Sequence, residues 1–179
     1  RAEHGGKPAA RQTGARLLYD AQNLYLLMKM DEPETQFLTA TSAGRDGKVW
    51  NDDCVEIFIS PVEGRTYHFI VNSSGAWYDA VLDVDDQTME GFVRDASFNS
   101  AAEIQTAVRD DCWVVAMSIP FNDFEVVPGA GHVWRINFVS GNKISGENSS
   151  FSPLVGDHYQ PRLFARLEFA ADGGWLEEA

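Results

Sequence analysis

The sequence predicts an all-β protein, a two-sheet antiparallel β-sandwich of jelly-roll or immunoglobulin-like type. Many short apolar segments recur along the chain, turn-forming residues separate them, and no long segment has a helical period. Only residues 120–127, which begin with a proline, suit a short helix. A chain of 179 residues is long enough for one domain with a sizeable core.

The expected strands follow one another at short intervals, and Gly, Asn, Asp, Ser or Pro lies between most of them. They cover residues 16–19, 24–30, 55–59, 67–72, 76–82, 103–108, 113–119, 134–138 and 163–169. Within the segment 134–138, Trp134, Ile136 and Phe138 alternate with polar residues, which is the pattern of a half-buried strand. Several such strands in series indicate an antiparallel sandwich.

The composition indicates one domain between two less regular ends. We expect a flexible or divergent N-terminal segment at residues 1–15, the sandwich at 16–170 and a C-terminal tail at 171–179. The chain begins without Met, as a mature product or an excised module would, so a missing signal peptide says little about its compartment.

The net charge of -13 disfavours partners that attract basic surfaces, namely nucleic acids and anionic membranes. No run of 18 apolar residues predicts a transmembrane helix. The two cysteines, Cys54 and Cys112, lack metal-ligand spacing and each begins an expected strand. A disulfide and two buried thiols both fit this placement, and the thiols are favoured because strand cysteines usually serve packing.

The segment from Trp50 to Ser60 carries the strongest functional signal. Its strand places Glu56 between apolar neighbours on one face, and Trp50 stands at the entrance of the strand. A flat apolar ring beside a carboxylate acceptor suits a sugar, which has apolar C–H faces and hydroxyl edges. The same pattern also fits a buried structural glutamate with Trp50 as a lid, because a buried carboxylate needs partners in any role.

The sequence offers little support for catalysis or a resident cofactor. It lacks the G-x-S-x-G, H-E-x-x-H and Walker-type motifs, and Asp52, Asp53 and Glu56 offer a glycosidase carboxylate pair by proximity alone. The acidic run Asp83–Asp86 with Glu90 lacks the glycine and the length of a calcium loop, so a solvated turn is the better interpretation. We therefore expect no enzymatic activity and no required cofactor.

The order of several segments resembles the family 9 carbohydrate-binding modules and their DOMON-like relatives. The matching pieces are Tyr19-Asp20 with Asn23-Leu24-Tyr25, Trp50-x-x-Asp53-x-Val55-Glu56-Ile57-Phe58-Ile59, Tyr67-His68-Phe69-Ile70-Val71-Asn72 with Gly75, Trp113-x-Val115, Ile119-Pro120-Phe121, Trp134-Arg135-Ile136-Asn137-Phe138, Phe151-Ser152-Pro153, and Pro161-x-x-Phe164-x-x-Leu167. Together and in order, they are fairly specific for the superfamily and less so for a ligand.

The resemblance implies a two-sheet sandwich that binds a terminal sugar between two tryptophan rings. Trp50 matches one ring, and Phe151 stands where the second tryptophan aligns. Glu56 matches a polar reader of hydroxyls, with His68 and Asn72 beside it as further hydrogen-bonding groups. A basic reader is replaced here by an isoleucine, Ile70, which removes one directional contact worth about 0.5–1.5 kcal/mol.

The resulting hypothesis is a non-catalytic, extracellular or periplasmic carbohydrate-binding module of a glycan-degrading protein, with a covalently linked glycoside hydrolase domain as a partner. Structural calcium is implied by the family without identifiable ligands. Two alternatives stay open: a structural or protein-interaction sandwich with a lost sugar site, and a haem-binding DOMON-like electron-transfer domain. The haem alternative would need an axial pair such as His68 with Met28, Met30 or Met117.

Overall fold

The computed structural model describes residues 2–3, 8–84, 92–156 and 158–170. Its strands are β1 (Ala2–Glu3), β2 (Thr13–Tyr19), β3 (Asn23–Asp31), β4 (Cys54–Val62), β5 (Arg65–Asn72), β6 (Trp77–Val84), β7 (Phe92–Asp95), β8 (Glu103–Val108), β9 (Cys112–Pro120), β10 (Val133–Gly141), β11 (Asn148–Ser150) and β12 (Ala165–Glu168). In this part of the chain the helical turns are short 3-10 segments: η1 (Thr35–Phe37), η2 (Val49–Asn51), η3 (Phe121–Phe124) and η4 (Pro161–Leu163). The short helix expected at 120–127 is thus the single turn η3.

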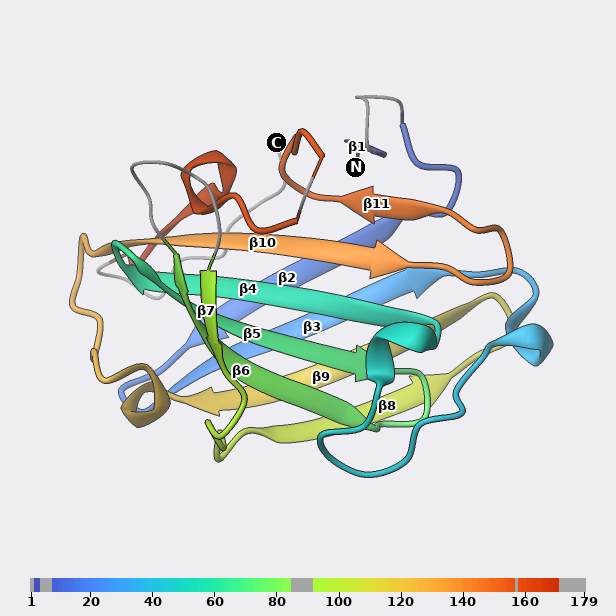
Figure 1. The fold of residues 1–179 in the computed structure, drawn as a ribbon, viewed down its shortest axis with the longest axis horizontal. Helices are drawn as coiled ribbons and strands as arrows, with labels where there is room; N and C mark the ends of the chain where they lie inside the picture. Colours follow the sequence, from blue (N-terminus) through green and yellow to red (C-terminus); the bar gives the residue numbers. More distant parts are fainter. Residues whose placement is uncertain (1, 4–7, 85–91, 157, 171–179) are drawn as a thin grey trace.

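The strands form two sheets packed face to face, and Figure 1 shows the strands of the two layers crossing at an angle. The larger sheet has the order β1-β11-β10-β4-β5-β6-β7, with β12 also paired to β10. The smaller sheet has the order β2-β3-β9-β8, and every pairing between named strands is antiparallel. The predicted antiparallel sandwich is confirmed, and the segment 92–95, for which no strand was expected, adds an edge strand.

The core between the sheets follows the alternation that the sequence shows. Val55, Ile57 and Ile59 on β4 point inward and are fully buried together with Phe69 on β5 and Trp134 on β10. The opposite face of the larger sheet, here called the outer face, carries the alternate residues. Two smaller apolar clusters lie on it, one around Val49, Ile70 and Tyr78 and one around Phe58, Leu154 and Phe164. The outer face is therefore partly covered by η2 and by the segment 151–164.

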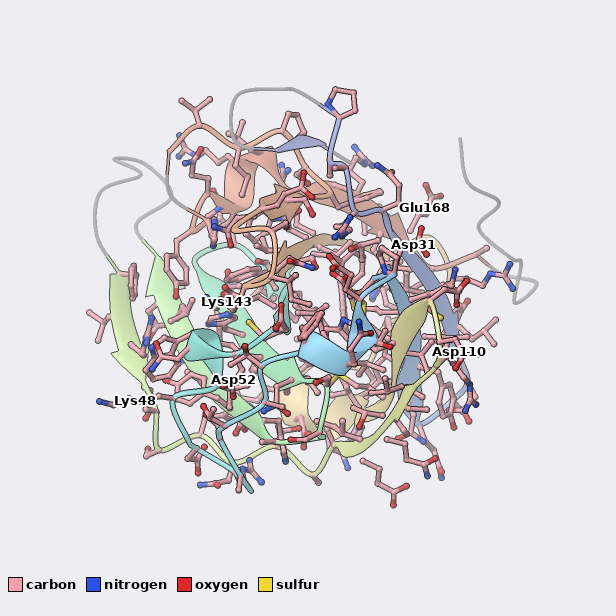
Figure 2. The ribbon with its side chains drawn as sticks, turned by 90° about the vertical axis from the view of Figure 1, so that its right-hand side faces the viewer. Asp31, Lys48, Asp52, Asp110, Lys143 and Glu168 are labelled. Carbon is pink, nitrogen blue, oxygen red and sulfur yellow. The ribbon has the colours of Figure 1, made fainter. Side chains whose placement is uncertain are left out.

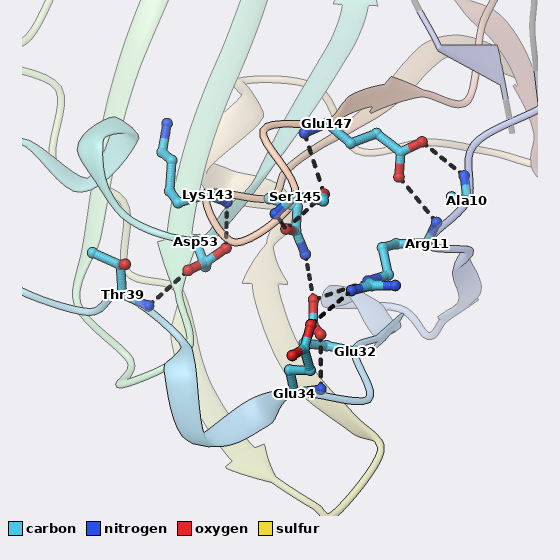
Figure 3. Close-up of polar contacts among 10 residues, drawn as sticks. Ala10, Arg11, Glu32, Glu34, Thr39, Asp53, Lys143, Ser145 and Glu147 are labelled. Carbon is cyan, nitrogen blue, oxygen red and sulfur yellow. Dashed lines mark hydrogen bonds and ion pairs between the residues drawn. The ribbon is translucent and has the colours of Figure 1, made fainter.

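Part of the N-terminal segment is built into the sandwich. β2 begins at Thr13, and Arg11 donates from Nε to the fully buried Glu32 at 3.2 Å. Glu32 also accepts from Asn142 Nδ2 at 2.6 Å. Figure 3 shows Glu147 accepting from the backbone of Ala10 and Arg11. Burial raises the pKa of Glu32, but the hydrogen bonds that Glu32 accepts from Asn142, the Glu34 backbone and Arg11 outweigh burial. The pKa of Glu32 is therefore below its ordinary value. The proposed tail at 171–179 lies outside the described residues.

Both cysteines are buried free thiols, one in each sheet. Burial raises the pKa of Cys54 and of Cys112, so both stay protonated at neutral pH. The prediction of two buried packing thiols is therefore confirmed. Among the described residues, no helix is long and apolar enough to cross a membrane.

Candidate functional site

The candidate site lies on the outer face of the larger sheet, where β4, β5 and β6 run side by side. Glu56 on β4 is opposite Ile70 on β5, and Ile70 is opposite Tyr78 on β6, so the three side chains form one row across the sheet. In Figure 1, η2 covers one end of this face and β7 lies toward the other. The segment 151–164 comes over the face from the side of β10 through Tyr159, whose ring packs on Phe58.

Glu56 is held between two imidazole rings. Its Oε2 lies 2.9 Å from His68 Nε2, and its Oε1 lies 3.8 Å from His158 Nδ1. Burial would raise the pKa of Glu56, but the adjacent imidazoles of His158 and His68 outweigh that effect and lower the pKa to about 2. The side chain keeps 16% of its surface exposed. An ionised acceptor is therefore fixed in orientation with one part open to solvent.

His68 holds the Glu56 carboxylate through a hydrogen bond from the neighbouring strand β5. Its ring is buried and stacks on Phe58 with centroids 4.2 Å apart. Burial lowers the pKa of His68 more than the adjacent carboxylate raises it, so the ring is neutral at neutral pH and donates from Nε2. Its Nδ1 has no hydrogen-bond partner in the described part of the chain. His68 therefore positions Glu56 and does not itself reach the surface.

Trp50 presents the largest aromatic surface of the site. It lies in η2, and its ring meets Tyr78 edge-on with centroids 5.5 Å apart. Tyr78 is buried, whereas Trp50 is 40% exposed. Val49, which precedes Trp50 in η2, is the residue of this turn that packs against the sheet. Trp50 is therefore partly exposed on the same face as Glu56, and β5 lies between the strand of Glu56 and the strand of Tyr78.

Asn72 faces protein groups on all sides. Its Nδ2 donates to Asp52 Oδ2 at 2.9 Å and to the Ser42 carbonyl at 3.3 Å, and its Oδ1 accepts from Ser74 and Ala76. The Asn72 side chain is fully buried and all its donors and acceptors are used by protein groups. Asn72 therefore holds the surrounding loops and has no group left for a ligand. Asn72 was expected beside Glu56 as a further group for the ligand, whereas the structure buries it among loop residues.

Asp52 and Asp53 are anchors for the loops that hold η2. Asp52 accepts from the backbone of Thr41 and Ser42 and from the Thr41 hydroxyl, and burial, which raises its pKa, is outweighed so that the pKa falls to about 2. Figure 3 shows Asp53 accepting from the backbone of Thr39 and Lys143. Both donor–acceptor distances are 2.6 Å. Figure 2 shows Asp52 and Lys143 at this loop-bearing end, with Lys48 pointing outward. Both carboxylates are committed to loop donors, which disfavours the glycosidase pair.

Phe151 lies away from Trp50. Its backbone N–H continues the ladder to Phe138, and its ring packs on Phe138 with centroids 6.0 Å apart. Phe138 belongs to the inner face of β10, whereas Trp50 rests on Tyr78 on the outer face of β6, three strands along. The expected clamp of Trp50 with Phe151 is therefore not formed. The physical reason is strand alternation, since Ser150 takes the outward position on β11 opposite Val139 and sends Phe151 to the other face.

Four residues that the sequence analysis did not select also line the face. Arg94 and Phe92 come from β7, and His158 and Tyr159 come from the segment 151–164. Tyr159 packs on Phe58, His68 and Phe92, with ring centroids between 4.4 and 5.6 Å apart. Loop aromatics were the available signal, but β7 was not predicted as a strand and its register with β6 could not be read from the chain.

The candidate metal and haem ligands lie apart from one another in the described part of the chain. No cluster of three His, Cys, Asp or Glu side chains there could hold a metal ion. The acidic run named above lies mainly outside the described residues, and Asp83 is paired with Arg65 at 3.3 Å. Met28, Met30 and Met117 lie in the inner core while His68 is on the outer face, so the sheet separates the suggested axial pair.

The arrangement can bind hydroxyl groups against apolar rings. Glu56 supplies an ionised acceptor, Trp50 a stacking surface and Arg94 several N–H donors on one face. Reversible binding is therefore the chemistry that the geometry supports.

Comparison with known families and structures gives a consistent result. The family model described as carbohydrate family 9 binding domain-like matches residues 4–147. A search of curated proteins gives no match. A protein from Bacteroides uniformis, described as a candidate carbohydrate-binding protein, superposes with a TM-score of 0.71 at 21% identity over 94% of this chain and 83% of its own.

A family 9 carbohydrate-binding module from Caldicellulosiruptor kristjanssonii also has the same fold. Its structure with glucose gives a TM-score of 0.64 at 17% identity, covering 90% of this chain and 78% of the module. Its structure with cellotriose gives 0.62 at 18% identity, covering 90% and 77%. At these sequence identities, the two structures show only that the chain has the same fold. Glucose and cellotriose are ligands of the Caldicellulosiruptor module.

Proposed function

Because this chain belongs to the carbohydrate family 9 binding domain-like family, we propose that it is a non-catalytic module that binds a neutral sugar on the outer face of its larger sheet. The single observation that carries the proposal is the partly exposed ring of Trp50 on the same face as a pre-oriented, ionised Glu56. The ring offers a stacking surface to C–H groups, and the carboxylate accepts hydroxyl protons.

The charge distribution favours a neutral ligand. Glu56 is ionised at neutral pH and the whole chain carries a net charge of -13, so an anionic glycan would meet repulsion. A neutral sugar gains charge-assisted hydrogen bonds from its hydroxyls to Glu56, which are about twice as strong as neutral ones. His68 keeps the carboxylate in one orientation, and that lowers the entropy lost on binding.

We expect the affinity to be modest. The apolar Ile70 lies opposite Glu56 and offers it no hydrogen-bonding neighbour, and Phe151 does not complete a clamp over Trp50. The exposed site lets water compete for each contact. A dissociation constant in the micromolar range or weaker, which corresponds to about -8 kcal/mol or less in magnitude, follows from this geometry.

The proposed context is a glycan-degrading protein that acts outside the cytoplasm, with a glycoside hydrolase domain on the same chain. Polymeric glycans are found there, and a binding module raises the effective concentration of a linked domain at its substrate. The support for this context is the family membership and the sugar-bound relatives.

Calorimetric titration with glucose and cellotriose tests the function. The wild-type protein should bind at least one of these sugars, and Trp50→Ala should weaken binding by tenfold or more. Phe151→Ala is the matched control, because it removes an exposed aromatic ring from the opposite face of the sheet. Failure of the wild type to bind a panel of neutral sugars, or equal affinities for wild type and Trp50→Ala, would refute the proposal.

A further inference from the structure

Arg94 reaches over the aromatic surface of the outer face from the edge strand β7. It is opposite Leu82 on β6, so its side chain projects from the outer face. Its Nη2 donates to the Tyr159 hydroxyl at 2.7 Å, and its guanidinium carbon lies 6.0 Å from the Tyr78 ring and 5.5 Å from the Phe92 ring. These contacts fix the position of a cation in the middle of the face.

Among the described residues, the guanidinium of Arg94 leaves most of its donors unused. Within this part of the chain it forms no ion pair, and one hydrogen bond to Tyr159 uses one of its five N–H groups. Arg94 itself is exposed. A fixed, exposed guanidinium with several donors available can bind two neighbouring hydroxyl oxygens at once.

The aromatic surface around Arg94 is longer than one sugar ring. Trp50 lies on Tyr78 near the start of β6, whereas Phe92 is opposite Val84 at the end of that strand. The guanidinium carbon of Arg94 separates the Tyr78 and Phe92 rings, because it lies 6.0 Å from the centroid of the first and 5.5 Å from the centroid of the second. Arg94 and Tyr159 lie between these ends, and Phe92 is 37% exposed. The surface from Trp50 to Phe92 therefore offers a second stacking position.

From this geometry we infer that Arg94, Phe92 and Tyr159 form a second subsite, which receives the further sugars of a neutral oligosaccharide whose first sugar lies at Trp50 and Glu56. The inference rests on the proposed function and deepens it. Arg94 donates to the hydroxyls of the second or third sugar, Phe92 stacks on it, and Tyr159 orients the guanidinium.

The position of Arg94 indicates the length of the ligand. Arg94 is on β7, the strand beyond Tyr78 on β6, whereas Glu56 is on β4. Such a donor sits beyond the first sugar, so it contributes chiefly to binding of a longer chain. The ligand class is accordingly a neutral oligosaccharide of two or more units rather than a monosaccharide.

The test is calorimetric titration of glucose, cellobiose and cellotriose into wild type, Arg94→Gln, Tyr159→Phe and Trp50→Ala. For the wild type, the affinity for cellotriose should exceed that for glucose by tenfold or more. Arg94→Gln should reduce this ratio to about twofold, and Tyr159→Phe should reduce it less, because the ring stays while the hydroxyl that orients Arg94 is lost. Arg166→Gln, at an exposed position on β12, is the matched control and should leave the ratio unchanged.

The outcomes separate the inference from the function on which it rests. Equal wild-type affinities for glucose and cellotriose, or an unchanged ratio in Arg94→Gln with weaker binding in Trp50→Ala, would overturn the second subsite and leave the proposed function standing. If Arg94→Gln lowered the affinities for glucose and for cellotriose by the same factor, the second subsite would also be overturned. Arg94 would then contact the first sugar. Absence of binding to all three sugars by the wild type would overturn both.

Discussion

Replacing Asp52 with asparagine should loosen the loops that position Trp50. The Asp52 carboxylate is fully buried and accepts four hydrogen bonds, from Thr41 N and Oγ1, Ser42 N and Asn72 Nδ2, at 2.7–3.0 Å. Asp52 directly follows η2, so these bonds fix the segment that carries Trp50. The amide of an asparagine at this position would turn an N–H₂ group toward two of these donors and leave at least one buried N–H without an acceptor.

The expected cost follows from those contacts. An unsatisfied buried polar group costs about 1–3 kcal/mol, and the lost charge-assisted bonds add to that. We expect the free energy of unfolding to fall by about 3 kcal/mol at pH 7, which lowers Tm by roughly 6–12 °C in a domain of this size. Sugar affinity should fall as well, because the ring of Trp50 is less firmly held.

The loss should depend on pH. The pKa of Asp52 is lowered from 3.8 to about 2, so its ionised form adds stability above pH 3.8 that is lost as the pH falls toward 2. This lowering of the pKa corresponds to a pH-dependent part of at most about 2 kcal/mol. Denaturant unfolding at pH 7, 5 and 3 measures it, with Thr41→Val as the matched variant that removes one donor. A difference between wild type and Asp52→Asn that stays constant down to pH 3, or no difference at pH 7, would refute the reasoning.

Two further substitutions test other parts of the description. Glu56→Gln should weaken sugar binding by about tenfold or more between pH 4 and 7, because the carboxylate stays ionised down to about pH 2 and charge-assisted bonds are the stronger ones. Titration at both pH values measures this, and a lowered Tm with unchanged affinity would assign Glu56 a purely structural role. Arg45→Ala should destabilise the fold by about 3–5 kcal/mol, because Arg45 forms two bonds to the buried Asp79, at 3.1 and 2.7 Å. Burial raises the pKa of Asp79, so thermal unfolding should show a smaller loss at pH 5 than at pH 8, and an equal loss at both would contradict the assignment.

The sequence by itself determined the architecture, because strand alternation is a local property. The pattern Val55, Ile57, Ile59 against Cys54, Glu56, Phe58 identifies two faces of β4, and both are as expected in the structure. The order of such segments also identified the family. Trp50 and Glu56 were selected because an aromatic ring and a carboxylate in an apolar strand are unusual enough to stand out in the chain itself.

Only the tertiary structure decided which side chains meet. The family resemblance pairs Phe151 with Trp50, but the register of β11 with β10 turns the Phe151 ring to the inner face. Asn72 reads as an exposed polar residue at a strand end until Asp52 and Ser42 are found around it. Arg94 and Tyr159 are 65 residues apart, and their 2.7 Å contact depends on β7 joining the edge of the sheet and on the segment 151–164 crossing its face. Alternation specifies the face of a strand, whereas pairing register and loop paths depend on the packing of the whole chain.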